Sequence, residues 1–170
     1  GETLVAKERS PFAVVPKNTV LVKSISRDER HLETQLLHYD GTAWQGYSYR
    51  WNEEQTDATL VSAAGESVTI TEKPWTFHSR ADCVRCHNIG SDYRLSFHPG
   101  QLDRDGQLAR FQDLGLINDI FVSKREKQPS ALVSDVDAPI ELRARTWLSA
   151  NCAHCHRNRG GGSVTIKMDL

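Results

Sequence analysis

Two short stretches of the chain combine cysteine and histidine at a spacing that suits covalent attachment of an iron cofactor. Their reactive residues are Cys83, Cys86 and His87 in the first stretch, and Cys152, Cys155 and His156 in the second. These positions use all four cysteines of the chain. Two thiols one helical turn apart can reach the two vinyl groups on one edge of a porphyrin, and the histidine that follows can bind the iron. The pattern Cys-x-x-Cys-His is therefore typical of c-type haem attachment.

Two other uses of paired cysteines stay open. Four thiolates can hold one zinc ion, but the usual spacing between such pairs is roughly 15–20 residues, and Cys86 and Cys152 are much farther apart. A redox-active disulfide usually accompanies a βαβ pattern, which this sequence lacks, and it gives no reason for a histidine after each pair. We therefore predict two covalently attached haem c groups, with His87 and His156 as the proximal iron ligands.

The sequence identifies the second axial ligand of each iron less clearly than the proximal histidine. Met168 is the only methionine, and His/Met ligation raises the reduction potential relative to His/His. The alternative is that Met168 packs in a short strand over residues 163–170. His98 and His78 flank the first motif and are the other candidate iron ligands, although a single histidine is more often an ordinary surface or core residue. His154 is expected to face solvent.

The elements that would position the motifs indicate an α+β fold with two domains. An antiparallel β region is expected at residues 1–75, and a mostly helical, cytochrome c-like dihaem region at residues 76–170. The runs rich in strand formers lie at residues 19–25, 32–39, 43–51, 58–62 and 67–71. We expect an antiparallel sheet or small sandwich of about five strands. Asp40-Gly41 predicts a hairpin turn, and the last two runs are expected to pair with each other.

Helices are predicted around both motifs. Ser79 and Asp82 form a capping-box pattern just before the first motif. A second helix is expected within residues 104–117, ending at Gly115. Its apolar residues on one side would be Leu108, Phe111 and Leu114. The clearest helical pattern covers residues 137–156 and leads directly into the second motif.

Five stretches resemble, in order, a family of bacterial exported dihaem c-type cytochromes. They are TVLVKSI, LETQLLHYDGTAWQGYSYRWNEEQTDATL, SRADCVRCHN, QLDRDGQLARFQDL and RARTWLSANCAHCHRNRGGGS. The resemblance covers most of residues 16–163, and YRWNEEQTDA and NCAHCHRNRGGG are its family-specific parts. Some members are joined to, or encoded with, propeller-type sugar dehydrogenase-like domains. The resemblance implies an exported electron carrier, and in similar proteins a further helical segment with a Met-Pro pair follows.

The composition limits which kinds of partner and which cell compartment we expect for this protein. The formal net charge of −1 gives no reason to expect nucleic acid. No apolar run approaches the roughly 18 residues of a transmembrane helix, and the stretch GETLVAKERS has no apolar core of a signal peptide. Haem is attached to thiols outside the cytoplasmic membrane in bacteria, so we expect a periplasmic or otherwise exported protein whose signal has been removed.

Three functions remain open from the sequence. The leading one is electron transfer between a redox partner, such as a sugar or alcohol dehydrogenase, and a respiratory acceptor. Docking would be weak and transient, as in redox encounters generally. The alternative is a dihaem peroxidase-like enzyme with one open haem site. A third hypothesis is a binding module, in which the aromatic-rich residues 43–51 contact a partner or a carbohydrate.

Overall fold

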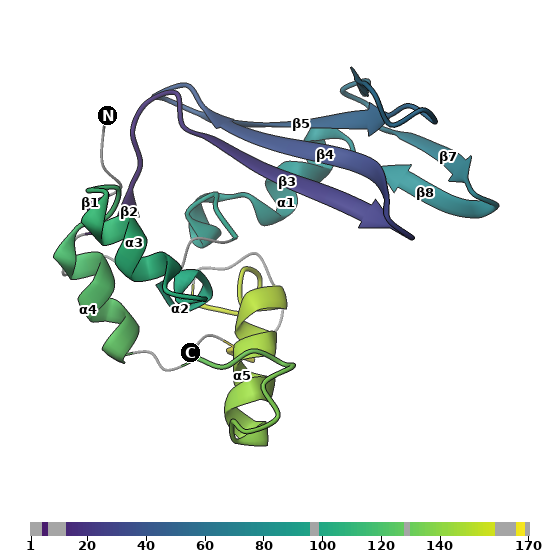
Figure 1. Ribbon diagram of the computed structural model, residues 1–170. Helices are drawn as coiled ribbons and strands as arrows, with labels where there is room; N and C mark the ends of the chain where they lie inside the picture. Colours follow the sequence, from purple (N-terminus) through teal and green to yellow (C-terminus); the bar gives the residue numbers. More distant parts are fainter. Residues whose placement is uncertain (1–4, 7–12, 96–98, 128–129, 159–165, 169–170) are drawn as a thin grey trace. The chain divides into compact units, whose positions relative to one another are not determined.

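The computed structural model describes residues 5–6, 13–95, 99–127, 130–158 and 166–168 (Figure 1). It contains an antiparallel β region and several helices, which confirms a mixed α+β class. Contacts group the chain into two compact units. One unit is Lys17–Arg85, and the other combines Gly1–Pro16 with Cys86–Leu170.

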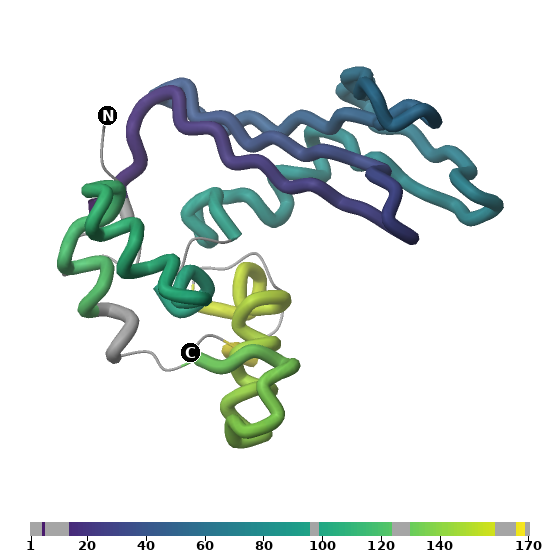
Figure 2. Tube along the Cα trace, viewed as in Figure 1, coloured from purple at the N-terminus to yellow at the C-terminus, as the bar shows by residue number. Residues whose placement is uncertain are grey.

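The unit Lys17–Arg85 is built on a four-stranded antiparallel sheet. Its strands are β3 (Val20–Arg27), β4 (Arg30–Tyr39), β5 (Trp44–Trp51) and β6 (Ala58–Leu60), in that order. Figure 2 traces β3, β4 and β5 running side by side. These strands are rich in the β-branched and aromatic residues that favour a pleated, half-buried surface. The predicted runs at residues 19–25, 32–39 and 43–51 are therefore confirmed as strands.

The turn between β4 and β5 forms where the Asp-Gly pair predicts it. The Asp40 Oδ1 atom accepts the backbone N–H groups of Thr42 and Ala43, at 2.7 and 2.8 Å. Gly41 adopts a φ of 100°, which glycine reaches without steric cost. The hydrogen bonds from Ala43 and then Thr42 stabilise the charged form, so the pKa of Asp40 lies well below its usual range.

The predicted pairing of residues 58–62 with residues 67–71 is wrong. Strand β6 pairs with β5 instead, and β7 (Glu66–Ile70) forms a hairpin with β8 (Lys73–Phe77). Strand β8 is not predicted from the sequence because it contains Pro74, and proline usually breaks strands. Proline is tolerated at edge positions, and both strands of a two-stranded hairpin are edges. Phe77, at the end of β8, is only 1% exposed.

The second unit is mainly helical. Its elements are β1 (Val5–Ala6), β2 (Ala13–Val14), the 3-10 helix η1 (Ile89–Ser91), α2 (Pro99–Leu102), α3 (Gln107–Asp113), α4 (Asp119–Lys127) and α5 (Ile140–Asn151). Helix α4 packs against α2, α3 and β1. None of the described helices combines the length and apolarity needed to span a membrane.

A small hydrophobic core holds α2, α3 and α4 together. Its buried members are Leu102, Leu108, Ile117 and Phe121. Phe111 packs against this cluster, so two of the three residues predicted for one side of α3 do face the core. Leu114 does not, because α3 ends at Asp113 and the side chain of Leu114 is 62% exposed. Gly115, with φ of 66°, follows the helix end as predicted.

Candidate functional site

The first Cys-x-x-Cys-His motif lies on and just after helix α1 (Arg80–Cys86). The predicted capping box is confirmed: the Asp82 backbone N–H donates to Ser79 Oγ at 3.1 Å, and the Ser79 backbone N–H donates to Asp82 Oδ2 at 3.2 Å. The Ser79 hydroxyl also donates to that carboxylate, which lowers the pKa of Asp82. This cap starts α1 one turn before Cys83, so both motif cysteines lie on helical backbone.

His87 follows α1 directly and has one ring nitrogen already bonded. Its Nδ1 atom lies 2.6 Å from the backbone carbonyl oxygen of Tyr93. A carbonyl only accepts, so Nδ1 carries the proton in this contact and Nε2 keeps its lone pair. Metal-binding histidines usually have this arrangement, with the second nitrogen donating to a carbonyl or carboxylate. The geometry of His87 therefore suits an iron ligand.

The loop that places the Tyr93 carbonyl is tightly hydrogen-bonded. Asn88 caps η1 by accepting the backbone N–H groups of Gly90 and Ser91, at 2.8 and 3.3 Å. The Ser91 hydroxyl, in a residue that is 1% exposed, donates to the carbonyl of Cys86 at 2.5 Å. Tyr93 itself has a φ of 59°, in the left-handed region. These bonds connect the end of α1 to the residue that holds the His87 ring.

The second motif forms one further turn after α5. The backbone N–H groups of Cys155 and His156 both donate to the carbonyl of Cys152, at 3.1 and 2.9 Å. The thiols of Cys152 and Cys155 therefore belong to a single turn, with His156 at its end. The Nδ1 atom of His156 is buried and has no hydrogen-bond partner among the described residues.

The candidate second axial ligands are placed differently. The backbone N–H of Met168 donates to the carbonyl of His156 at 2.8 Å, so Met168 lies beside the second motif. Its neighbours Ile166 and Lys167 are not in a strand, so the strand predicted over residues 163–170 is not formed at residues 166–168. His78 is exposed and follows β8. His98 lies outside the described residues. The iron-ligand roles of all three stay predictions.

All four cysteines are thiols in this structure. Burial raises the pKa of the Cys83 thiol, and the charges of Asp82 and Glu33 raise it further. Strand β5 comes close to the same residue. A Cβ atom added at Gly46 would lie 3.0 Å from both the Cβ and the Sγ of Cys83. Gly46 therefore makes room for the first cysteine of the first motif.

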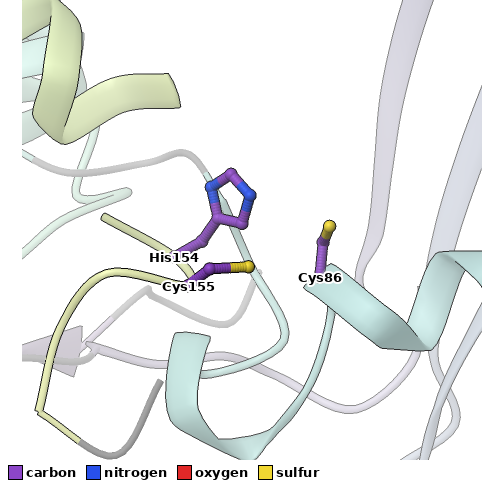
Figure 3. A group of neighbouring side chains, drawn as sticks. All are labelled: Cys86, His154 and Cys155. Atoms are coloured by element: carbon purple, nitrogen blue, oxygen red, sulfur yellow. The ribbon is translucent and has the colours of Figure 1, made fainter. Parts of the chain in front are cut away.

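The structure also brings together three residues that no single sequence motif joins. The ligand atoms of Cys86, His154 and Cys155 all lie within 4.8 Å of one another (Figure 3). His154 is partly buried, so the expectation that it faces solvent is wrong. Burial lowers its pKa, and the charges of His87 and His156 lower it further. One cysteine of each motif thus lies beside a histidine that neither motif uses as a ligand.

Sequence reasoning missed two buried charged residues. Glu33 is 1% exposed, and its carboxylate accepts hydrogen bonds from Gln35 Nε2 at 2.9 Å and Trp75 Nε1 at 3.2 Å. Arg94 is 7% exposed and forms an ion pair with Asp92, and burial lowers its pKa to about 10. Each residue lies in a segment where a charged side chain is ordinary, so nothing in the sequence indicates that Glu33 or Arg94 is buried.

Helices α1 and α5 bury none of their own residues. Val84 on α1 and Trp147 on α5 are 52% and 50% exposed. One of these helices carries the cysteines of the first motif and the other leads into the second, and each has an exposed apolar side chain that can pack on a large apolar group. The exposed Val84, the exposed Trp147 and the His87 ring are each compatible with the predicted haem attachment, which stays a prediction.

Comparisons with known proteins found no match. No protein-family model, curated protein or solved structure matches this chain.

Proposed function

We propose that this protein is a periplasmic dihaem c-type cytochrome that transfers electrons between a dehydrogenase or other redox partner and a respiratory acceptor. One observation carries the proposal: the Cys-x-x-Cys-His pattern occurs twice, each time at the C-terminal end of a helix, and uses every cysteine of the chain. The resemblance of the surrounding stretches to exported dihaem cytochromes agrees with it.

The residues that would hold the cofactors follow from the two motifs. The thiols of Cys83 and Cys86 would form the thioether bonds of one haem, and those of Cys152 and Cys155 would form the bonds of the other. Haem supplies a one-electron iron couple whose potential depends on the axial ligands and on burial. His87 and His156 are the proposed proximal ligands, and the second axial ligands are proposed among Met168, His98 and His78.

The hydrogen bond of His87 to Tyr93 bears on how the proposed ligand would bind its iron. Its Nδ1–H donates to the Tyr93 carbonyl, which fixes the ring orientation and makes Nε2 a stronger electron donor. A stronger donor stabilises the oxidised metal and so lowers a reduction potential. His156 has no such bond to Nδ1 among the described residues. The two proximal sites would therefore differ in potential, with the first site the lower, if the second axial ligands are alike.

Covalent haem content tests the proposal directly. The chain should be exported with a cleavable signal into a bacterial periplasm that has the haem-attachment system, then denatured and weighed by mass spectrometry. We expect the mass of two haems on the chain and one haem on each double variant, Cys83→Ala/Cys86→Ala and Cys152→Ala/Cys155→Ala. A chain that keeps no haem after denaturation would overturn the assignment.

Carbon monoxide separates electron transfer from the peroxidase-like alternative. The dithionite-reduced protein should show sharp α and β bands that carbon monoxide leaves unchanged, because six-coordinate irons have no open position. A large spectral shift would show that at least one iron has an open or easily displaced ligand position. That outcome would favour the dihaem peroxidase-like alternative over the electron carrier.

A further inference from the structure

The cluster of Cys86, His154 and Cys155 has the composition of a metal site in its own right. We propose that the haem-free chain binds one zinc ion through the Sγ atoms of the two cysteines and one ring nitrogen of His154. This site is distinct from a four-cysteine site, because it uses His154 and leaves out Cys83 and Cys152. It also does not depend on the proposed electron-transfer function.

The distances suit this ion. Zinc binds thiolate sulfur at about 2.3 Å and imidazole nitrogen at about 2.0–2.1 Å. Tetrahedral angles then place any two ligand atoms roughly 3.5–3.8 Å apart. The three ligand atoms lie within 4.8 Å of one another, so each pair needs to approach by at most about 1.3 Å. Side-chain rotation supplies a movement of this size without moving the backbone.

The backbone on both sides of the cluster is held by hydrogen bonds. The carbonyl of Cys86 accepts the Ser91 hydroxyl at 2.5 Å. The Cys155 N–H donates to the carbonyl of Cys152 at 3.1 Å, which fixes the turn that carries His154. Figure 3 shows Cys86, at the end of α1, across from His154 and Cys155, with the Cys155 sulfur pointing toward it. The ligands are therefore partly pre-positioned before any ion binds.

The ligand chemistry selects zinc among the abundant divalent ions. Thiolates and imidazole are soft or borderline donors that bind zinc in preference to magnesium or calcium, which need oxygen ligands. Two cysteines and one histidine leave the fourth tetrahedral position for water, as in zinc sites with three protein ligands. Binding displaces the thiol protons of Cys86 and Cys155, so the ion exchanges for protons and no redox step is involved.

Zinc binding and haem attachment exclude each other at two positions. The thioether bonds of the proposed haems would consume the thiols of Cys86 and Cys155, which are two of the three zinc ligands. The zinc site is therefore a property of the chain before haem attachment. Bound zinc would protect one cysteine of each motif from oxidation until the haems are attached.

The test uses the full 170-residue chain, produced without haem attachment, freed of metal and kept reduced with a phosphine. Cobalt(II) is the probe, because thiolate-bound cobalt gives a sulfur-to-metal charge-transfer band and intense visible bands when tetrahedral. We expect both signals to saturate at one cobalt per chain and to disappear when zinc displaces the cobalt. The proposal would be overturned if no charge-transfer band appears, or if the signals do not level off at one cobalt per chain.

Variants identify the ligands. His154→Ala, Cys86→Ser and Cys155→Ser should each weaken zinc affinity by at least about tenfold. The matched controls are Cys83→Ser and Cys152→Ser, which remove the other cysteine of each motif and should leave the affinity within about twofold. Equal losses in all four cysteine variants with none in His154→Ala would show a four-cysteine site and refute ours.

Two further measurements keep the outcomes separate. Far-UV circular dichroism of each variant checks that it is folded, and His154→Gln repeats the ligand loss with a side chain of similar size if His154→Ala does not fold. Covalent haem on the exported chain is measured independently by mass. A chain that binds zinc but takes no haem refutes only the proposed function, and a chain that takes haem but binds no zinc refutes only the zinc site.

Discussion

The close approach of β5 to the first motif predicts that Gly46→Ala destabilises the unit Lys17–Arg85. The new Cβ atom would lie 3.0 Å from the Cβ and Sγ atoms of Cys83. Comfortable carbon contacts are about 3.5–4.0 Å, so one side must move by about half an ångström. Movement of α1 is opposed by its cap, in which Ser79 and Asp82 exchange hydrogen bonds.

Two opposing effects set the size of the change. Replacing glycine by alanine restricts the unfolded chain, which stabilises a compatible site by about 0.4–1 kcal/mol. Gly46 does not have a positive φ, so alanine fits its backbone. Overpacking a close contact costs about 1–3 kcal/mol. The overpacking term is the larger one, and we expect a net loss of about 1–2 kcal/mol in the free energy of unfolding.

Urea unfolding of the haem-free chain, followed by tryptophan fluorescence, measures this loss. Three of the four tryptophans belong to this unit: Trp44, Trp51 and Trp75. For a urea slope of about 1–3 kcal/mol per molar, the midpoint should fall by about 0.3–2 M. The control is the same substitution in a Cys83→Gly background, where neither the Cβ nor the Sγ atom remains to be displaced. There we expect a loss smaller by at least about 0.5 kcal/mol.

Two outcomes would refute the reasoning. If Gly46→Ala raises the urea midpoint, the restriction of the unfolded chain outweighs the overpacking. The approach of β5 to Cys83 is then not tight. If the substitution costs the same with cysteine or glycine at position 83, the strain arises elsewhere on β5. In either case Gly46 would not be a residue that positions the first cysteine.

Two other predictions concern the same unit. Glu33→Gln should lower the free energy of unfolding by about 1–3 kcal/mol, because the buried carboxylate accepts two side-chain hydrogen bonds. The exposed control Glu54→Gln should change it by less than about 0.5 kcal/mol, and equal effects would contradict the burial of Glu33. The pKa of Asp82 is lowered in the folded chain by hydrogen bonds from Ser79, so its contribution to stability is present above the unfolded-state pKa and is lost as the pH falls through the folded-state pKa. Asp82→Asn should therefore flatten the acid side of a plot of stability against pH, and an unchanged slope would argue against the cap.

Local patterns predicted much of the β region. The strands β3, β4 and β5 and the turn at Asp40 were predictable, because strand propensity and Asp-Gly turn chemistry act between residues adjacent in the chain. The capping box of Ser79 and Asp82 is local for the same reason. In each case the residues that decide the structure lie within a few positions of one another.

Strand pairing and helix faces were less predictable. The partner of β7 is β8, and Pro74 within β8 made that strand hard to predict. The apolar side of α3 was predicted except at Leu114, because the helix ends one residue earlier. Pairing and burial depend on which surfaces meet in the folded chain, and the sequence pattern of one segment does not contain that information.

The chemistry proposed for the two motifs rests on the sequence alone, because a Cys-x-x-Cys-His pattern places its groups on one helical turn wherever that turn lies. The sequence thus singled out Cys83, Cys86, His87, Cys152, Cys155 and His156. Only the tertiary structure showed that Cys86 approaches His154 and Cys155, that the Tyr93 carbonyl holds His87, and that Glu33 is buried. The first and last of these depend on how distant segments pack, and the second depends on the path of a loop with left-handed residues. Spacing along the chain fixes only neighbours within a turn, and contacts between separate elements are decided by packing.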